Sequence, residues 1–431
     1  MALLDKVTCP HCWAVFETHE VLWVTAHNSL RGDPKLGRDA EKRYLPTRFT
    51  PDGLGIDEMN GRSHRIACPT CHLEIPRAAT EMASWMVSVI GAPASGKSFY
   101  LGALAYSLRR LLLGRFRVSF TDADPDLNRL INHYEQSMFG HPRPNDLIDP
   151  GELIPKTQLT GELYSRVFLG GEWVLYPRPF LFALRPDAAH PHVADPTSAA
   201  RLLCLYDNAG ESFLPGGDSA GSPVTRHLAQ ASVLTFLFDP TQDSEFRRAH
   251  LEHGAAGLPA DDRLKLRQQQ TILTEAALRV RQFNNMPSGK KHDKPLFVVV
   301  TKQDLWGHEV PAVADPQPLL LQGPTGIACL NLTRIEAVSA GIREMLLRHC
   351  PGVVDAAESF ANSVVYVGAS SFGTRPERVD GGPWMIRPRD IRPVGVEVPI
   401  LYGLNRHMPG LFPSGRLKPG DGSGSHPAAR R

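Results

Sequence analysis

Long apolar segments and a surplus of charge of one sign are both missing from this 431-residue chain. No run of eighteen or more apolar residues occurs, and the start, MALLDKVTCPHC, lacks a basic stretch followed by an apolar one. We therefore expect a cytoplasmic protein that neither spans a membrane nor is exported. Lys and Arg number 47 against 45 Asp and Glu, so no basic excess indicates nucleic acid as the main partner.

Cysteine is scarce too, and it is unevenly placed. Four of the seven cysteines form two C-x₂-C pairs, CPHC and CPTC, at Cys9, Cys12, Cys68 and Cys71. Both thiolates of such a pair can bind one ion, and four thiolates complete a closed tetrahedral zinc site. In a reducing compartment, close pairs indicate metal ligands rather than disulfides. We predict one structural zinc ion, with buried free cysteines or a redox pair as the alternatives.

Residues 1–80 contain both pairs, are rich in turn residues and show little helical periodicity. This predicts a small, separate zinc-ribbon module. Residues 13–67 between the pairs make a longer spacing than ribbons usually have, so we expect an insertion with its own turns. The nearby His11, His64 and His72 are available as substitute ligands, but we expect them to be bystanders. Ribbons bind nucleic acid or proteins, and the sequence does not decide between these two roles.

Apolar runs alternate with amphipathic segments from about residue 85 onward. The runs lie at 85–90, 116–120, 179–184, 201–206, 232–238, 295–300 and 363–368. Most are continuous rather than alternating, which is typical of strands covered on both faces. Helical spacing predicts a helix from Ser98 that stops at Gly114, and further helices at 125–139, 261–283 and 330–349.

These patterns predict an α/β fold, a three-layer sandwich around a mostly parallel sheet, over residues 81–412. Two segments rich in Pro and Gly, 140–178 and 369–395, predict loops or insertions. The tail, 413–431, predicts disorder.

A phosphate-binding motif, GAPASGKS, follows the first apolar run and opens the first helix. In such a loop backbone N–H groups wrap around the β-phosphate, Lys97 neutralises β- and γ-phosphate oxygens, and the Ser98 hydroxyl binds Mg²⁺. The helix adds its positive N-terminal end. The predicted nucleotide contacts here are Gly91, Ala94, Ser95, Gly96, Lys97, Ser98 and Phe99.

Two further motifs follow later runs. Asp207 begins a D-x-x-G sequence that ends at Gly210, so the carboxylate can hold Mg²⁺ through water and the glycine N–H can reach the γ-phosphate. An ordinary surface turn is the alternative. Thr301, Lys302 and Asp304 lie in the sequence TKQD, where a carboxylate can accept the paired N–H donors of guanine. The alternative is an Asp at a helix start beside a surface Lys.

A fourth, weaker signal follows the last run. In the sequence GASS, a backbone N–H at Ala369 or Ser370 can reach the guanine carbonyl, although a plain loop fits as well.

With these four motifs in this order, residues 85–373 resemble the Ras-like GTPases of the translation-factor-related class. The resemblance implies binding of GTP and GDP with Mg²⁺ at the carboxyl edge of the sheet. The guanine-reading motif of that family usually begins with Asn, whereas this chain has Thr301. The whole organisation also resembles the double-GTPase components of bacterial conflict systems, which implies a second GTPase or an activating protein as partner.

The resemblance further implies a switch threonine that closes over Mg²⁺, for which Thr157 is the first candidate and Thr160 the second. Family members often carry Gln directly after D-x-x-G, where this chain has Glu211. We expect slow GTP hydrolysis by Lys97, Thr157, Gly210 and Glu211, and a protein effector that reads the switch. The alternatives are a P-loop ATPase or kinase, and a non-hydrolysing adaptor that acts through its ribbon.

Overall fold

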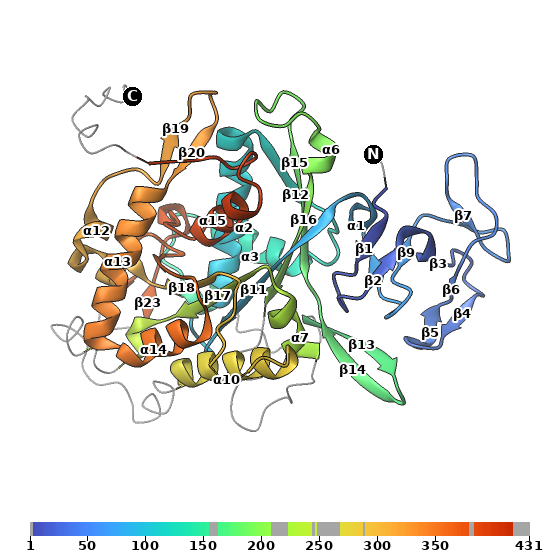
Figure 1. The fold of residues 1–431 in the computed structure, drawn as a ribbon, viewed down its shortest axis with the longest axis horizontal. Helices are drawn as coiled ribbons and strands as arrows, with labels where there is room; N and C mark the ends of the chain where they lie inside the picture. The colour runs from blue at the N-terminus through green and yellow to red at the C-terminus, as the bar shows by residue number, and fades with distance from the viewer. Residues whose placement is uncertain are drawn as a thin grey trace.

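The structure is a computed structural model that describes residues 3–154, 163–207, 223–243, 246–247, 268–287, 289–378 and 383–416. Its centre is a seven-stranded sheet built from described strands (Figure 1). In spatial order these are β12 (Val118–Asp122), β15 (Phe180–Pro186), β16 (Arg201–Asp207), β11 (Ala83–Gly91), β17 (Val233–Phe238), β18 (Leu296–Val300) and β21 (Val364–Gly368). All seven predicted apolar runs contribute to this sheet, which confirms the predicted α/β fold with a mostly parallel sheet.

The direction of the strands places several chain segments at one edge. The four pairings β16–β11, β11–β17, β17–β18 and β18–β21 are parallel, whereas β15 is antiparallel to both of its neighbours among the described strands. Strand order reverses at β11, because the next parallel strand along the chain, β16, lies on one side of it and the one after, β17, on the other. Sheets of this kind bind ligands at the carboxyl ends of the strands beside such a reversal.

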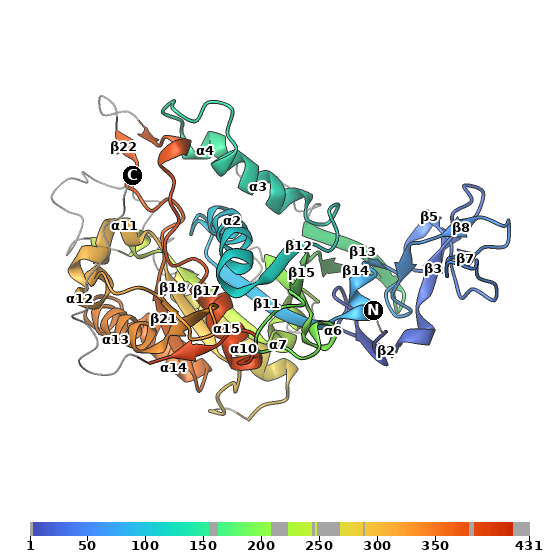
Figure 2. The same cartoon turned by 90° about the horizontal axis from the view of Figure 1, so that it is seen from above.

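Helices cover the sheet from both sides (Figures 1 and 2). The longer described helices are α2 (Lys97–Phe116), α3 (Arg129–Phe139), α7 (Pro223–Gln230), α10 (Gln268–Phe283), α13 (Leu332–His349), α14 (Pro351–Phe360) and α15 (Val398–His407). The short ones are α1 (Ala78–Glu81), α4 (Pro150–Leu153), α6 (Pro196–Ala199), α11 (Gln303–Trp306) and α12 (Pro311–Ala314).

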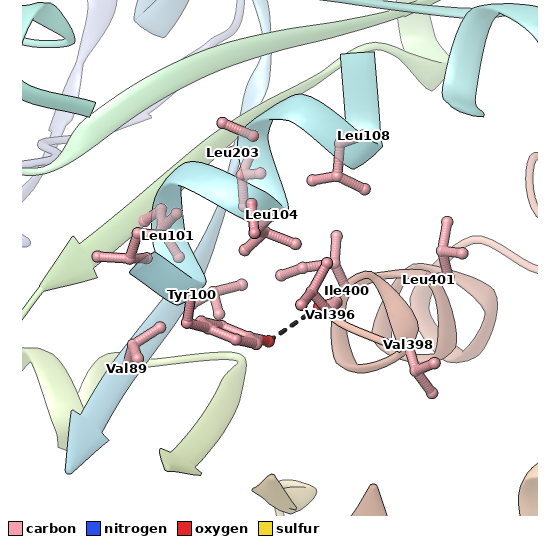
Figure 3. Packing of buried hydrophobic residues seen from close by; sticks show 14 of the residues in the cluster. Val89, Tyr100, Leu101, Leu104, Leu108, Leu203, Val396, Val398, Ile400 and Leu401 are labelled. Atoms are coloured by element: carbon pink, nitrogen blue, oxygen red, sulfur yellow. Dashed lines mark hydrogen bonds between the residues drawn. The ribbon is translucent and has the colours of Figure 1, made fainter. Parts of the chain in front are cut away.

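The side chains of β11, the central strand, pack into hydrophobic cores on both faces of the sheet. Val87 and Val89 of β11 pack with α2, α3 and α15, whereas Ile90 packs on the opposite face with α7, α10 and α14. Figure 3 shows the first core, in which Tyr100 of α2 donates a hydrogen bond of 3.0 Å to the carbonyl of Val396 just before α15.

The N-terminal segment consists of short antiparallel strands. They are β1 (Lys6–Thr8), β2 (Val15–Glu17), β3 (Leu22–Val24), β4 (Arg31–Asp33), β5 (Gly37–Glu41), β6 (Arg43–Tyr44), β7 (Gly55–Ile56), β8 (Arg62–Ser63), β9 (Ile66–Ala67) and β10 (Glu74–Ile75). The first cysteine pair lies in the turn between β1 and β2, and the second in the turn between β9 and β10. The strands β3 to β8 lie between these two turns.

This segment, which we call the ribbon, packs directly on the sheet. Val7, Trp13 and Ile66 of the ribbon share one buried cluster with Leu202 and Cys204 of β16. The same cluster includes the other face of β15, so the ribbon covers strands that α2 and α15 cover from the opposite side. Figure 1 shows the ribbon alongside β16, joined to β11 through the short helix α1. The ribbon thus shares a buried core with the sheet and is not attached to it through a linker alone.

Several sequence predictions need correction. Helix α2 continues past Gly114 to Phe116, so the strand predicted at 116–120 begins at Val118 instead. The segments predicted as loops or insertions are not plain loops, because they contain α4 and two hairpins, β13 (Tyr164–Leu169) with β14 (Glu172–Pro177), and β22 (Glu377–Arg378) with β23 (Trp384–Met385). In the predicted disordered tail, β24 (Ser414–Gly415) pairs with β20 (Ala328–Asn331), which also pairs with β19 (Leu320–Gln322). The rest of the tail from residue 417 lies outside the described residues.

Replacement of Leu104 by Ala tests the core beneath the phosphate loop. Leu104 is 1% exposed between the sheet and α15, so we expect Leu104→Ala to lower the free energy of unfolding by about 2–5 kcal/mol. Leu113→Ala is the matched control, because Leu113 lies on the same helix and is 61% exposed; its effect should stay within about 0.5 kcal/mol. Urea denaturation with zinc in the buffer measures both, and equal losses would contradict this packing.

Candidate functional site

The phosphate loop connects the end of β11 to the start of α2. Gly91 lies so close to β17 that a Cβ atom there would be 2.9 Å from the carbonyl oxygen of Leu237, so a larger residue would push the loop away. Ala94 and Gly96 have positive φ values of 60° and 87°, which curl the chain before the helix. Lys97 folds back over the loop, with its Nζ donating to the carbonyls of Gly91 at 2.8 Å and Ala92 at 3.1 Å.

The start of α2 supplies the other groups that the motif requires. Ser98 and Phe99 lie in the first turn of the helix, whose first N–H groups have no partner within the helix. Phe99 packs edge-on against Phe372, with ring centroids 5.2 Å apart, so the aromatic ring ties the loop to the segment after β21. Ser95 is 1% exposed, and its hydroxyl has no hydrogen-bond partner among the described residues. A polar loop of this shape fits a phosphate chain.

Asp207 is the last residue of β16 and pairs in register with Val89 of β11, two residues before Gly91. The carboxylate is therefore carried by the strand next to the phosphate loop, and the residue is 6% exposed. The Asp207 carboxylate and the Ser98 hydroxyl are both oxygen ligands of the kind that Mg²⁺ prefers. The arrangement fits a magnesium–phosphate group held by Ser98 and, through water, by Asp207.

Lys302 follows β18 in a left-handed conformation, with φ of 55°. Its Nζ donates to Asp239 Oδ2 at 2.7 Å and to the Thr241 hydroxyl at 2.8 Å. Asp239 follows β17, is fully buried, and also accepts from the N–H of Thr241 at 3.0 Å. Sequence reasoning missed Asp239, although Asp-Pro directly after an apolar run at the same sheet edge is a detectable signal. The pair fixes the lysine stem over the edge of the sheet.

Asp304 lies in α11, just after Lys302, and its Oδ1 accepts a hydrogen bond of 2.5 Å from the Ser370 hydroxyl. Burial raises the pKa of the Asp304 carboxyl, and the Ser370 hydroxyl acts in the opposite direction. A carboxylate that accepts from one hydroxyl keeps lone pairs for further N–H donors. Two motifs 66 residues apart are thus joined by a side-chain contact.

The backbone after β21 differs in detail from the expectation. The N–H of Ala369 donates to the carbonyl of Val300 at 3.0 Å, and that of Ser370 donates to the carbonyl of Val394 at 2.9 Å. Both N–H groups are therefore occupied within the protein.

Three of the predicted catalytic residues, Thr157, Gly210 and Glu211, and the second switch candidate, Thr160, lie outside the described residues. The described candidates, in contrast, gather at the carboxyl ends of four strands in one sheet. Gly91 ends β11, Asp207 ends β16, Thr301 follows β18 and Ala369 follows β21. The described motifs therefore lie along one edge of the sheet.

The second candidate site is the cysteine cluster of the ribbon. The sulfur atoms of Cys9, Cys12, Cys68 and Cys71 all lie within 4.8 Å of one another. Cys9 Sγ is 3.8 Å from Cys71 Sγ, and Cys12 Sγ is 3.7 Å from Cys68 Sγ. A tetrahedron with Zn–S bonds of about 2.3 Å has edges of about 3.8 Å, so this cluster fits Zn²⁺.

The two C-x₂-C turns have matching backbones. The N–H of Cys9 donates to the carbonyl of Ala14, and that of Cys68 donates to the carbonyl of Leu73. Trp13 and His72 follow the second cysteine of each turn, with positive φ values of 61° and 64°. We call residues 9–14 the first knuckle and residues 68–73 the second knuckle.

The histidines of the ribbon have other partners. His11 Nε2 is 2.9 Å from the carbonyl of Glu74, and His72 Nδ1 is 2.8 Å from Asp33 Oδ2. Burial lowers the pKa of His11 to about 4, so the ring is neutral at pH 7. His64 is exposed. The four cysteine sulfurs alone fit the closed ligand set of a structural zinc site.

Comparison with known proteins gives one distant relative. No family model matches the chain. A protein of Mycolicibacterium smegmatis, named as an ESX-1 scaffolding and assembly protein, SaeC, is 27% identical over 259 residues. That match covers 56% of this chain, and the chain spans 58% of the length of this relative.

Solved structures with a similar fold are GTPase domains, at low TM-scores. The GTPase-like domain of S. cerevisiae Ski7 bound to GTP is 12% identical, with 77% of this chain and 51% of that chain covered and a TM-score of 0.28. The SRb–GTP/SRX complex from Chaetomium thermophilum is 15% identical, with 70% and 94% covered and a TM-score of 0.27. Aquifex aeolicus Era bound to GDP and aluminium fluoride is 11% identical, with 79% and 61% covered and a TM-score of 0.22.

Among the residues described, none of the helices has the length and apolar character needed to cross a membrane.

Replacement of one thiolate tests the metal site. We expect the purified wild-type protein to contain about one zinc per chain and Cys68→Ser to contain little or none, because a closed structural site needs all four ligands. Cys329→Ser is the control, since Cys329 lies in β20, outside the cluster, and should keep the full metal content. Elemental analysis measures all three proteins. A wild-type protein without zinc, or equal losses in both variants, would rule out the site.

Proposed function

We propose that this chain is a GTP-binding molecular switch that hydrolyses GTP slowly and whose nucleotide state is read by a protein partner. The observation that carries the proposal is the contact between Asp304 and Ser370, at the same sheet edge as the phosphate loop. A phosphate loop alone fits any nucleoside triphosphate. A half-buried carboxylate held at a second strand end adds a group that distinguishes one base from another.

Each described residue has a role in this proposal. The loop N–H groups and Lys97 hold the β- and γ-phosphates, and Ser98 and Asp207 hold Mg²⁺, which neutralises the charge on the phosphates. Lys302, fixed by Asp239, places its stem along the base and sugar. Asp304 accepts from the two N–H donors of guanine, a pattern that adenine lacks. The roles of Thr157, Gly210 and Glu211 in hydrolysis rest on the sequence alone.

The partner in this proposal is a protein, either an effector, an activating protein or a second GTPase. Scaffolding and assembly, the words in the name of the M. smegmatis relative, support a switch that acts within a protein assembly. The same name favours a second candidate, an adaptor that binds nucleotide without hydrolysing it. Release of phosphate from GTP by the purified protein, with and without candidate partners, distinguishes the two.

Replacement of Asp304 by Asn tests base selection. The change removes one charged acceptor and offers an amide donor instead, so we expect GTP affinity to fall by about 10- to 100-fold, as for the loss of a hydrogen bond to a charged group worth about 1.5–3 kcal/mol. Asp315→Asn, at the C-terminus of α12, is the control and should bind GTP as the wild type does. Calorimetric titration with Mg–GTP, Mg–ATP and Mg–XTP measures the affinities. A GTP preference that survives Asp304→Asn would remove this residue from the base site.

Turnover gives an independent test. We expect wild-type phosphate release on the order of 10⁻³ per second without a partner, as in switch GTPases that lack an activating residue. Lys97→Ala should abolish release at GTP concentrations that saturate the wild type, because the γ-phosphate loses its counter-charge. Lys291→Ala, an exposed lysine outside the site, is the matched control. Release of phosphate by Lys97→Ala at the wild-type rate would identify the activity as a contaminant.

A further inference from the structure

The first knuckle is hydrogen-bonded to the strand that carries Asp207. The hydroxyl of Tyr206 donates to the carbonyl of Pro10 at 2.7 Å and accepts from Trp13 Nε1 at 3.1 Å. Tyr206 is fully buried, and burial raises the pKa of its hydroxyl. The neutral phenol therefore uses both its donor and an acceptor position on the knuckle. Pro10 and Trp13 of the first knuckle therefore hold the side chain of Tyr206, the residue directly before Asp207.

The same aromatic side chain holds helix α7. The ring of His227 in α7 stacks on Tyr206 at 5.4 Å with an interplanar angle of 19°, and Trp13 lies edge-on to it at 6.2 Å. His227 Nδ1 is also 3.2 Å from the hydroxyl of Ser88 in β11. Burial lowers the pKa of His227 to about 3, so an uncharged ring stacks here at pH 7. His227 thus contacts Trp13 of the ribbon, Tyr206 of β16 and Ser88 of β11.

These contacts lie next to the candidate nucleotide site in the chain. Ser88 and Tyr206 are paired in register, so they sit side by side in β11 and β16. Three residues after Ser88 comes Gly91, and directly after Tyr206 comes Asp207. Helix α7 is the first described helix after Asp207. A shift at the end of β11 or β16 would therefore reach the rings of Tyr206, His227 and Trp13 through direct contacts.

We propose that Tyr206 couples the ribbon to the nucleotide site, so that the first knuckle senses which nucleotide is bound and, in return, biases nucleotide affinity. The inference rests on the proposed function and concerns the regulation of that same site. Coupling between two sites is reciprocal, so a knuckle that changes with the nucleotide must also change nucleotide binding. A protein that binds the ribbon would then act on the switch from outside the nucleotide site.

The second knuckle provides an internal control. It has the same backbone hydrogen bonds as the first, but its carbonyls accept from Lys35 at Thr70 and from Arg43 at His72, both within the ribbon. A general loosening of the ribbon would affect both knuckles. Coupling through Tyr206 affects the first knuckle alone.

Hydrogen exchange of the full, zinc-loaded chain tests the coupling. With Mg–GDP against Mg–GTPγS, we expect amide exchange in the first knuckle and in α7 to differ by about fivefold or more, the lower end of allosteric coupling, and in the second knuckle by less than about twofold. Tyr206→Phe removes the hydroxyl and keeps the ring, and should abolish the difference in the first knuckle. Zinc content should remain about one per chain in this variant.

Trp13→Phe is the second variant if Tyr206→Phe does not fold, because it removes the indole donor from the same hydroxyl. Trp23→Phe is the matched control, since Trp23 lies in the ribbon against Phe49 and should keep the wild-type difference. Equal differences in both knuckles, or a difference that persists in Tyr206→Phe or Trp13→Phe, would overturn the coupling. Calorimetry on the same samples separates the two failures: a wild type that binds neither nucleotide refutes the proposed function, whereas one that binds both with equal exchange refutes the coupling alone.

Discussion

Backbone pairing of β11 with its two neighbours determines where the candidate nucleotide contacts lie. Val89 is opposite Asp207 of β16, and Gly91 is opposite Leu237 of β17. The side chains of a strand alternate between faces, so a shift of one residue would turn Val87 and Val89 from the core beneath α2 into the core on the opposite face. The register that packs the core is therefore the register that brings the phosphate loop beside Asp207.

The ribbon packs on β15 and β16, the strands that follow β11 on one side of the sheet. Strands β15 and β16 carry buried residues on both faces, and the ribbon packs against one of these faces. A ribbon of short strands has little core of its own, so the four thiolates and the sheet together stabilise it. Unfolding of the ribbon would therefore uncover Leu202, Cys204 and Tyr206 of β16.

The sequence predicted the seven strands because buried parallel strands are continuous apolar runs, and it predicted the phosphate loop because that chemistry needs adjacent residues. The β13–β14 hairpin was missed because it is partly exposed, with Trp173 47% exposed, and its apolar runs, VFL and WVLY, are short. Helix α15 was not among the predicted helices; it carries Pro399 in its first turn, where proline is tolerated, and Gly403 in its interior. The contacts of Tyr206 had no local signal at all, since Trp13 is 193 residues away in the chain.

Hydrogen bonds of the Tyr206 hydroxyl fix the position of the ribbon on the sheet more narrowly than apolar packing would. An interface of aliphatic side chains tolerates sliding, because hydrophobic attraction has no direction. The Tyr206 hydroxyl has a donor and an acceptor partner at fixed positions, and leaving either partner unpaired in a buried site costs about 1–3 kcal/mol. That cost holds the first knuckle in one position on β16, and it makes any displacement of the strand end next to Asp207 a displacement of the knuckle as well.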